Sequence, residues 1–274
     1  MDNHQSLSRL ENLIIDMDGV LWRGAQPMPG LADFFTLLRQ RPINFVLATN
    51  NATKTPDYYV TRITSYGIEI GSDEVLTSAQ ATADYLARRS SPGTPVYVLG
   101  MEGLRQALAE RGFHLIDSDA EPGSAEYVVA GWDRQLTYDK LAEATLHIRA
   151  GARFIGTNPD RTWPSERGLI PGAGPILAAL EVATDVEPTI VGKPSPLMFQ
   201  TALDRLGADA TTTAMLGDRL ETDILGGHNA GLTTILVLSG VTTSDDLAAS
   251  SFQPDLVFDD ITALVHAWKT SHDD

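Results

Sequence analysis

Short apolar runs alternate with segments of helical periodicity along most of this chain. Residues 13–15 form an apolar run typical of a buried strand, and residues 43–48 form another. Between them, apolar residues recur at helical spacing over 31–40, directly after the Pro and Gly residues of a loop. The pattern predicts a strand, a helix and a second strand in succession.

The same alternation returns towards the C-terminus. It predicts strands at 189–191, 214–216 and 234–238, with helices at 196–206 and 223–230 between them. Alternating units of this kind form a doubly wound parallel sheet with helices on both faces, whose ligand site lies at the C-terminal ends of the strands. We therefore predict an α/β fold with a Rossmann-like, parallel-sheet core.

A further alternation of strands and helices occupies the middle of the chain. Its elements are predicted at 96–99, 104–111, 127–130, 138–149 and 154–155. This stretch is long enough to form a core of its own, because about 100 residues suffice for a domain. We therefore expect an inserted α/β domain at 79–185 and a core domain made of 1–78 plus 186–274.

Two acids follow the first predicted strand. Asp16 and Asp18 are two residues apart, so on an extended chain both carboxylates point to one side, and Gly19 permits a sharp turn beyond them. Paired carboxylates suit metal-assisted phosphoryl chemistry, with one as nucleophile and the other as general acid and base. A calcium loop also begins with D-x-D, but it requires Gly and Glu where this chain has Leu21 and Pro27. An EF-hand is therefore excluded.

Hydroxyl and amide side chains follow the second predicted strand. Thr49, Asn50 and Asn51 could hold phosphate oxygens through a hydroxyl, two amides and the N–H groups of a turn, without adding charge. Asn-Asn after a strand is also a common turn sequence. These three residues therefore indicate a phosphate site only in combination with other signals.

A lysine and a second pair of acids follow later strands. Lys193 lies between a predicted strand and a helix, and either a site lysine or a solvated surface lysine fits that position. It is not a P-loop lysine, because the glycine that this motif requires is Glu187 here. Asp218 follows the strand at 214–216, and Asp223 begins the next helix, where a carboxylate would also serve as an ordinary N-cap.

Other catalytic patterns are missing from the sequence. No serine has a glycine two residues before it, so there is no nucleophile elbow. The glycines at 172 and 174 lack the third glycine of a dinucleotide-binding motif. The six histidines have no metal-site spacing, and we expect them on surfaces or in loops.

Composition narrows the possible functions. The 274 residues are 43% hydrophobic and 20% charged, which allows a sizeable core. With 36 acidic and 20 basic side chains the net charge is −16 and no Lys/Arg run occurs, so nucleic acid is not an expected partner. The lack of cysteine excludes thiolate zinc sites and a cysteine nucleophile. Neither a signal peptide nor a run of about 18 apolar residues is present, so we expect a cytoplasmic protein that does not bind membranes.

The four groups of polar residues at strand ends resemble, taken together, the motifs of the haloacid dehalogenase (HAD) superfamily. The sequence of these motifs is similar to that of the subfamily IIA phosphatases, which include NagD, 4-nitrophenylphosphatase and phosphoglycolate phosphatase. The matching stretches cover nearly the whole chain: DMDGVLWRG (16–24), ATNNATKTP (48–56), TSAQATADYL (77–86), GTNPDRTWP (156–164), PGAGPILAALE (171–181), VGKPSP (191–196) and GDRLETDILGGHNAG (217–231).

The resemblance implies roles for the acids. Asp16 would be the nucleophile that forms an aspartyl-phosphate, and Asp18 would be the general acid and base. Mg²⁺ would be held by Asp16, the backbone carbonyl of Asp18 and the carboxylate of Asp218. Asp223 would orient metal-bound water or the site lysine.

The resemblance also implies the phosphate and cap residues. Thr49, Asn50 and Asn51 would take phosphate oxygens, and Lys193 would bridge the phosphate and the nucleophile. The inserted domain would be an α/β cap of the C2 type, which roofs the site and selects the substrate. The resemblance places residues 158–160 and the following loop near the substrate-facing side of this domain, so Arg161 and Trp163 are its candidates for contacting the leaving group. Residues 132–134 are a second set, which would equally fit a capped loop with a packed indole.

We therefore expect a Mg²⁺-dependent phosphatase, a HAD-like hydrolase that hydrolyses phosphate monoesters of small metabolites. A phosphotransferase or phosphomutase would retain the same acids, and a non-catalytic phosphometabolite-binding protein could use the same scaffold. The full acid set argues against the last alternative, since a binding protein has no use for a general acid beside the nucleophile. The sequence leaves the particular ester open, and also the oligomeric state, although related proteins often form homodimers through the cap.

Overall fold

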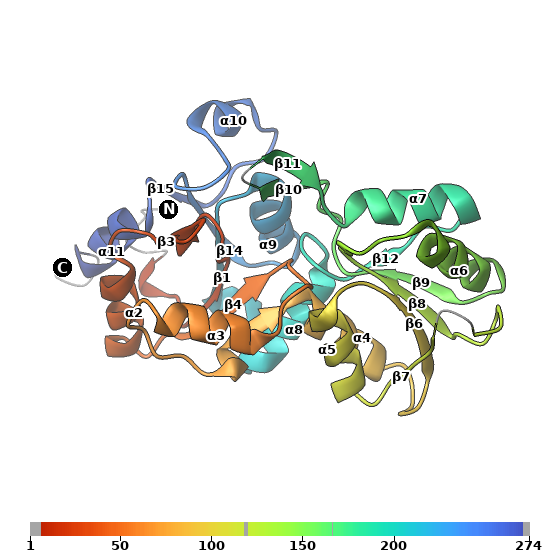
Figure 1. The fold of residues 1–274 in the computed structure, drawn as a ribbon. Coiled ribbons are helices and arrows are strands. Elements are labelled where there is room, and N and C mark those ends of the chain that lie inside the picture. The colour runs from red at the N-terminus through yellow and green to blue at the C-terminus, as the bar shows by residue number, and fades with distance from the viewer. Residues whose placement is uncertain (1–6, 118–119, 166, 271–274) are drawn as a thin grey trace. The chain divides into compact units, whose positions relative to one another are not determined.

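The chain forms two compact units, each built around a parallel sheet (Figure 1). The computed structural model describes residues 7–117, 120–165 and 167–270. The first unit consists of Met1–Thr49, Tyr59–Leu76 and Phe199–Asp274, and the second of Asn50–Tyr58 and Thr77–Met198. Residues 50–58 and 186–198, which the sequence groups with the core, thus pack with the second unit.

A six-stranded sheet forms the centre of the first unit. Its strands lie in the order β15-β14-β13-β1-β4-β5, with β1 parallel to both β4 and β13. Their bounds are β1 (Asn12–Ile15), β4 (Asn44–Thr49), β5 (Val75–Thr77), β13 (Thr213–Gly217), β14 (Thr233–Val237) and β15 (Leu256–Phe258). Numbered along the chain and read from β5, this is the order 3-2-1-4-5-6 of doubly wound folds, so the predicted Rossmann-like core is confirmed.

Helices cover both faces of this sheet. On one face α2 (Leu31–Gln40) and α11 (Ile261–Thr270) lie side by side and share one apolar core with alternate residues of the strands. On the other face α9 (Leu225–Asn229) lies so close that a Cβ added to Gly227 would be 2.9 Å from the Cβ of Met215. The helix predicted at 31–40 has the predicted bounds, because its apolar residues face this core.

Shorter elements complete the unit. They are the hairpin β2 (Trp22–Arg23) and β3 (Gln26–Pro27), helix α10 (Ser244–Ala249), the 3₁₀ turns η1 (Ser72–Glu74) and η2 (Ala210–Thr212) and the π-helical turn η3 (Leu220–Ile224). Two helices begin in the second unit and end in the first: α3 (Pro56–Thr64) and α8 (Pro196–Leu206).

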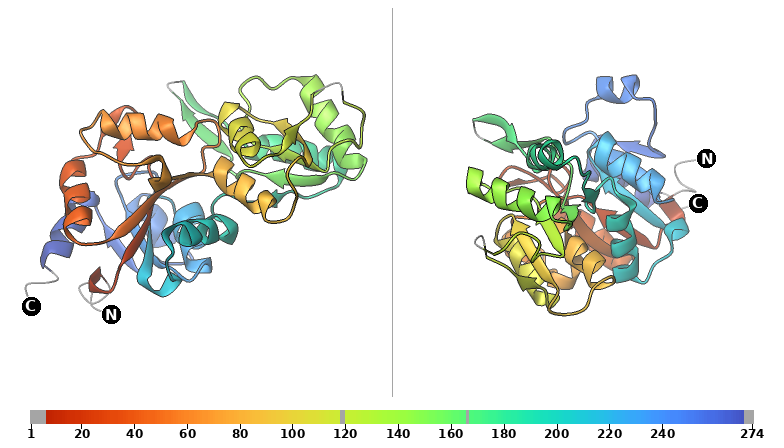
Figure 2. Two further views of the ribbon diagram at one scale, coloured as in Figure 1. Left: turned by 90° about the horizontal axis from the view of Figure 1, so that it is seen from below. Right: turned by 90° about the vertical axis from the view of Figure 1, so that its right-hand side faces the viewer.

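The second unit contains a five-stranded parallel sheet in the order β12-β9-β8-β6-β7. Its strands are β6 (Pro95–Leu99), β7 (His114–Leu115), β8 (Tyr127–Ala130), β9 (Arg153–Gly156) and β12 (Thr189–Ile190). Its helices are α4 (Ser78–Ala87), α5 (Glu102–Glu110), α6 (Tyr138–Arg149) and α7 (Gly174–Thr184), and β10 (Thr162–Ser165) and β11 (Gly168–Pro171) form a separate hairpin (Figure 2). The α/β architecture predicted for the middle of the chain is confirmed.

Two predictions about elements were wrong. The strand predicted at 189–191 belongs to the second sheet, where it pairs with β9, and not to the core sheet. The apolar pattern marked the strand, but two paired residues carry too little pattern to specify a neighbour. The helix predicted at 223–230 begins earlier, with the π-helical turn at 220–224, because the segment after β13 bends around the Asp223 carboxylate.

The prediction that all histidines lie on surfaces or in loops was also wrong. His147 in α6 is fully buried, its ring centroid lies 5.3 Å from that of Tyr97, and its Nδ1 accepts the N–H of Gly123 at 3.3 Å. An imidazole can occupy the apolar face of a helix when it stacks on another ring. His114, His228 and His266 are exposed, as predicted, and His4 and His272 lie outside the described residues.

In the part of the chain that the structure describes, no helix combines the length and the apolar character needed to cross a membrane.

Candidate active site

Three carboxylates converge at the C-terminal edge of the first sheet. Asp16 directly follows β1 and Asp218 directly follows β13, and these adjacent strands flank the point where the strand order reverses. Together with Asp223 of η3, each offers an oxygen within 4.8 Å of the others. Parallel pairing of β1 with β13 therefore brings together acids that are about 200 positions apart in the chain.

Close backbone contacts hold Asp218. The N–H of Val241 donates to its Oδ2 at 2.7 Å. A Cβ added to Gly240 would lie 1.9 Å from that oxygen, and one added to Gly19, whose φ is +94°, would lie 2.4 Å away. Both positions therefore require glycine, and the fully buried carboxylate of Asp218 is confined to one orientation.

Asp223 is held by the backbone of the preceding residues. Its Oδ2 accepts the N–H groups of Asp218 at 3.3 Å and Arg219 at 3.1 Å, and its side chain is only 1% exposed. An N-cap would accept from residues that follow it, so the N-cap alternative for this position was wrong. The carboxylate instead fastens the loop after β13 to the π-helical turn.

The donor set fits a divalent cation. Three carboxylates this close, two of them buried, repel one another, and a cation among their oxygens would offset that repulsion. Carboxylate and carbonyl oxygens are the usual protein ligands of Mg²⁺, whereas zinc and copper sites usually include imidazole or thiolate. Among the described residues this is the one such cluster, and Asp223 belongs to it beside the predicted Asp16 and Asp218.

The side chain of Asp18 makes a different contact. Its Oδ1 accepts the indole N–H of Trp22 at 2.8 Å, and the N–H of Gly19 donates to the carbonyl of Trp22 at 2.8 Å. The Trp22 ring is fully buried in the core, with the Arg62 guanidinium 4.1 Å from its centroid. The tight turn after β1 therefore gives the Asp18 carboxylate a fixed donor and leaves it outside the cluster of three.

The predicted phosphate-binding residues are divided between the units. Thr49 ends β4 in the first unit, whereas Asn50, Asn51 and Lys193 belong to the second. The Oδ1 of Asn51 accepts the N–H and the hydroxyl of Thr53 at 2.9 and 2.7 Å, so this side chain closes a turn. Lys193 is 2% exposed, so the alternative of a solvated surface lysine was wrong.

Two tryptophans lie near Asn50 and Asn51. Trp163 of β10 and Trp132, just past β8, have ring centroids 5.2 Å apart at an interplanar angle of 31°. Both rings line a narrow cavity of about 10 Å³ together with these two asparagines, which is room for a single water. Arg161 is exposed and does not line this cavity. Of the candidates in the second unit, Trp132 and Trp163 therefore lie together.

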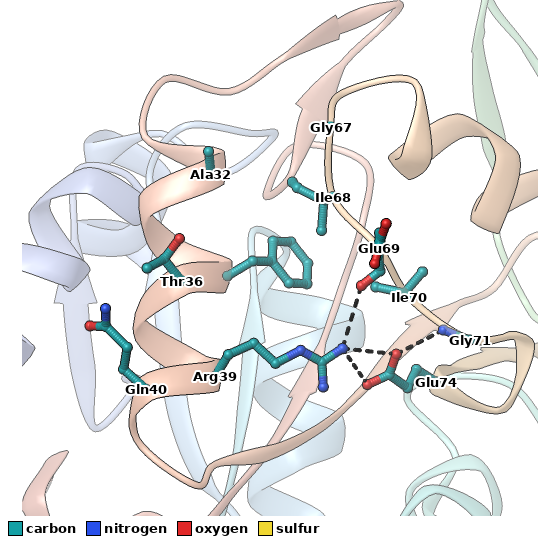
Figure 3. A pocket seen from close by; sticks show the side chains of 11 residues that line it. Ala32, Thr36, Arg39, Gln40, Gly67, Ile68, Glu69, Ile70, Gly71 and Glu74 are labelled. Carbon is teal, nitrogen blue, oxygen red and sulfur yellow. Dashed lines mark hydrogen bonds and ion pairs between the residues drawn. The ribbon is translucent and has the colours of Figure 1, made fainter.

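A roomier groove lies elsewhere on the first unit. It has a volume of about 860 Å³ between α2 and residues 67–74, and its Arg39 pairs with Glu74 at 2.8 Å (Figure 3). Arg39 also lies over the ring of Phe45 at the beginning of β4, whereas the three carboxylates follow strand ends. The groove therefore contains none of the predicted site residues.

Two further residues contact the predicted site, Trp22 and Asp160. The sequence assigned no role to Trp22, and the resemblance placed Asp160 near the substrate-facing side of the cap without naming a contact for it. Asp160 Oδ1 accepts the side-chain N–H of Asn50 at 2.9 Å. Asp160 follows the end of β9, so the rule that located the other candidates, polar residues past strand ends, also points to it. Trp22 carries no comparable signal, because its contact with Asp18 arises from the geometry of the turn.

Comparisons with known proteins agree with this architecture. The family model described as haloacid dehalogenase-like hydrolase matches residues 13–114, and a second HAD-hydrolase-like model matches residues 190–264. The acid sugar phosphatase of Staphylococcus saprophyticus is 41% identical over 252 residues, which are 92% of this chain and 95% of that protein.

Solved structures give the same picture. The 4-nitrophenylphosphatase from Thermotoga maritima matches with a TM-score of 0.90 at 35% identity, covering 96% of this chain and 99% of that one. A glycerol phosphate phosphatase from Mycobacterium tuberculosis, solved in complex with magnesium, matches with a TM-score of 0.85 at 34% identity, covering 94% and 77%.

The fold and the acidic strand ends define an α/β protein with a doubly wound core and a carboxylate site at its topological switch point. The chain belongs to the haloacid dehalogenase superfamily and is a HAD-like hydrolase, as the sequence motifs predicted.

Proposed function

We propose that this protein is a Mg²⁺-dependent phosphatase that hydrolyses phosphate monoesters of small metabolites through an aspartyl-phosphate on Asp16. The observation that supports the proposal is the convergence of the Asp16, Asp218 and Asp223 carboxylates past β1 and β13. The names of the relatives, a sugar phosphatase, a nitrophenylphosphatase and a glycerol phosphate phosphatase, point to the same substrate class.

In the proposed reaction, a carboxylate oxygen of Asp16 attacks phosphorus and the bond from phosphorus to the ester oxygen breaks. Asp18 gives its proton to the departing oxygen, which leaves as an alcohol. A water molecule then attacks the phosphorus of the aspartyl-phosphate and Asp18 takes a proton from that water. The bond from phosphorus to the Asp16 oxygen breaks, which restores the Asp16 carboxylate and releases inorganic phosphate. The indole N–H of Trp22 holds Asp18 in one orientation for both proton transfers.

The charge balance requires a cation. Two unit charges about 4 Å apart interact by about 4 kcal/mol in a surface-like dielectric, so a phosphate dianion facing several carboxylates would be strongly repelled. Asp16, the backbone carbonyl of Asp18 and Asp218 would hold Mg²⁺, which supplies positive charge that stabilises the transition state when bound. Asp223, in the same carboxylate cluster, would share in holding or orienting that ion. Lys193 would contribute the remaining positive charge. Because a single lysine does not offset several carboxylates, we expect poor binding of phosphate esters without Mg²⁺.

The second unit would act as the substrate-selecting cap of the C2 type. Trp163 and Trp132 offer flat apolar surfaces beside Asn50 and Asn51, which suits the apolar face of a sugar or an aryl group. Arg161 is exposed, and its contact with the leaving group stays a prediction of the sequence. A cytoplasmic location and a homodimer formed through the cap stay predictions of the sequence.

Phosphate release from 4-nitrophenyl phosphate and from a panel of sugar, polyol and nucleotide phosphates tests the proposal. We expect release with Mg²⁺, none with EDTA, and recovery when Mg²⁺ is added back. Release that persists in EDTA would refute the metal requirement, and no release from any ester would refute the phosphatase. Parallel reactions with added acceptor sugars separate the two enzymatic alternatives, because a phosphotransferase yields phosphorylated acceptors in place of inorganic phosphate.

A further inference from the structure

Both protons of the Asn50 side-chain amide are already used within the second unit. Its Nδ2 donates to Asp160 Oδ1 at 2.9 Å and to the backbone carbonyl of Lys193 at 2.9 Å. A carboxamide NH₂ has two protons and so makes two such donations. The Asn50 side chain therefore has no proton left for a phosphate oxygen.

The orientation of this amide follows from its neighbours. The acceptors, the Asp160 carboxylate and a peptide carbonyl, have no proton to give, so a reversed amide would set its oxygen against two other oxygens. Asn50 Oδ1 is buried without a hydrogen bond among the described residues. It faces Gly192, where an added Cβ would lie 2.8 Å from it. The amide is thus fixed at both ends: its nitrogen donates to Asp160, and its oxygen lies against the backbone at Gly192.

The backbone of Asn50 is fastened as well. Its carbonyl accepts the Ser78 hydroxyl at 2.6 Å and the Asn158 side-chain amide at 2.7 Å. Asn158 Oδ1 in turn accepts the N–H of Asp160 at 3.1 Å, and the N–H of Gly192 donates to the carbonyl of Thr157 at 2.9 Å. We call this set, Asn50 with Ser78, Asn158, Asp160 and the backbone of Lys193, the Asn50 clamp.

We propose that the Asn50 clamp positions Lys193 and the loop after β4 for phosphoryl transfer, and that the Asn50 side chain is not a phosphate ligand. Asp160 and Asn158 are then positioning residues, acting through Asn50. This inference rests on the proposed function, and it revises the role that the family resemblance implies for the Asn50 amide. It also explains why a carboxylate lies beside a predicted anion site: Asp160 binds the amide, while the phosphate draws on other donors of the loop.

Burial and loop connectivity agree with such a role. Asn50 is 8% exposed, Asn158 4% and Lys193 2%, so the hydrogen bonds of the clamp are shielded from water and resist exchange with it. The three loops that meet at Asn50 follow β4, β9 and β12, each at the C-terminal end of a strand. Displacement of one loop by a fraction of an ångström would therefore also move the Lys193 backbone.

The test is a double-mutant cycle on 4-nitrophenyl phosphate with Mg²⁺, using Asn50→Ala, Asp160→Ala and the double variant. We expect each single variant to lower kcat about 10- to 100-fold with a smaller change in KM, and the double variant to be no worse than the singles. Asp160→Asn should retain more activity than Asp160→Ala, because its amide oxygen can still accept from Asn50. Asp139→Ala, an exposed acid of α6, is the matched control and should behave as wild type.

If the kcat losses of the two single variants multiply in the double variant, Asn50 acts independently of Asp160. If inorganic phosphate inhibits Asn50→Ala less strongly but inhibits Asp160→Ala as it does wild type, the Asn50 amide binds phosphate. Either result would overturn the inference. Side-chain NH₂ exchange measured by NMR without substrate is the second readout. Asn50 should exchange slowly in wild type and in Asp160→Asn, and quickly in Asp160→Ala. Exchange as fast as that of the exposed Asn229 in wild type would also overturn it. An inactive wild type with a protected Asn50 amide would refute the phosphatase and leave the clamp standing.

Discussion

The two units use the same architecture for different chemistry. Each has a parallel sheet, and in each the chemically distinctive residues follow the C-terminal ends of strands. The first sheet presents carboxylates there, Asp16 after β1 and Asp218 after β13. The second presents an aromatic ring after β8, amide and acid side chains after β9, and Lys193 after β12.

This difference separates the proposed metal site from the proposed recognition site. Clustered carboxylates repel one another, and a cation bound among them would offset that repulsion. The second edge instead carries the ammonium group of Lys193 and flat apolar rings, which would suit anionic or apolar groups without a metal. Variants of the first edge should therefore change the metal requirement together with turnover. Variants of the second should change turnover through the position of its loops, or the choice of substrate, and leave the metal requirement as it is.

The largest effect is expected at the first edge, from Asp16→Asn. The amide cannot attack phosphorus as a carboxylate does, so kcat in saturating Mg²⁺ should fall by roughly 10³-fold or more. Circular dichroism and the melting temperature should stay close to those of wild type. The control Asp33→Asn removes an equal charge from the exposed side of α2 and should keep full activity. Near-normal turnover of Asp16→Asn would show that Asp16 is not the nucleophile.

The next effect concerns Gly240→Ala. The new Cβ would meet Asp218 Oδ2 at 1.9 Å, so the carboxylate must move, and the Mg²⁺ concentration for half-maximal activity should rise about 10- to 100-fold. Gly71→Ala is the matched control, since its Cβ would meet the exposed carboxylate of Asp73, which can swing into solvent. A Mg²⁺ titration of both variants measures the effect. If Gly240→Ala and Gly71→Ala need the same Mg²⁺ concentration for half-maximal activity, Asp218 does not bind the metal.

Trp22→Phe should have a smaller effect on turnover. It removes the indole N–H that donates to Asp18 while keeping a buried ring. We expect kcat to fall roughly tenfold, the lower end of the about 1.5–3 kcal/mol that hydrogen bonds to charged groups contribute. Trp268→Phe also deletes a buried indole donor, which bonds the Leu7 carbonyl at 3.1 Å. That control should lower the melting temperature and leave kcat unchanged. If both variants lose kcat equally, Trp22 acts through stability alone.

The smallest effect is a pH dependence of stability in the second unit. Burial lowers the pKa of His147 from its ordinary 6.5, against a smaller opposing effect of Glu143. The folded state therefore takes up this proton less readily than the unfolded chain. The corresponding stability is present above about pH 6.5 and is lost as the pH falls from there through the lowered folded pKa.

Melting temperatures measured at pH 7 and pH 5 check this prediction. The fall in melting temperature from pH 7 to pH 5 should be smaller in His147→Phe than in wild type, because the Phe ring can still pack on Tyr97 but does not titrate. His266→Gln, at an exposed position of α11, should lose as much as wild type. An unchanged loss in His147→Phe would mean that other groups dominate the acid sensitivity.

Much of the first unit was predictable because the information is local. Apolar spacing predicted α2 with its observed bounds, and apolar runs predicted β1, β4 and β13. Once a parallel sheet is inferred, residues that directly follow those strands must share one edge, so Asp16 and Asp218 were found without coordinates. Asp223 was found as well, but its contacts with the N–H groups of residues 218 and 219 were not, because they depend on the π-helical turn.

The second unit was less predictable because its features depend on long-range partners. A two-residue strand such as β12 does not encode that it pairs with β9. Nor does helical periodicity show that His147 is buried, since an imidazole is equally acceptable on a surface. Nor does it show that the rings of Trp132, just past β8, and Trp163 of β10 have centroids 5.2 Å apart.

The sequence by itself determined which residue types follow which strands, and hence the superfamily and the kind of chemistry, because periodicity and strand ends are local properties of the chain. Only the tertiary structure decided how the polar atoms are paired. The two protons of Asn50 are assigned to a carboxylate 110 positions away and to a carbonyl 143 positions away. Hydrogen-bond partners at that separation are chosen by the packing of whole sheets and loops, which no local pattern records.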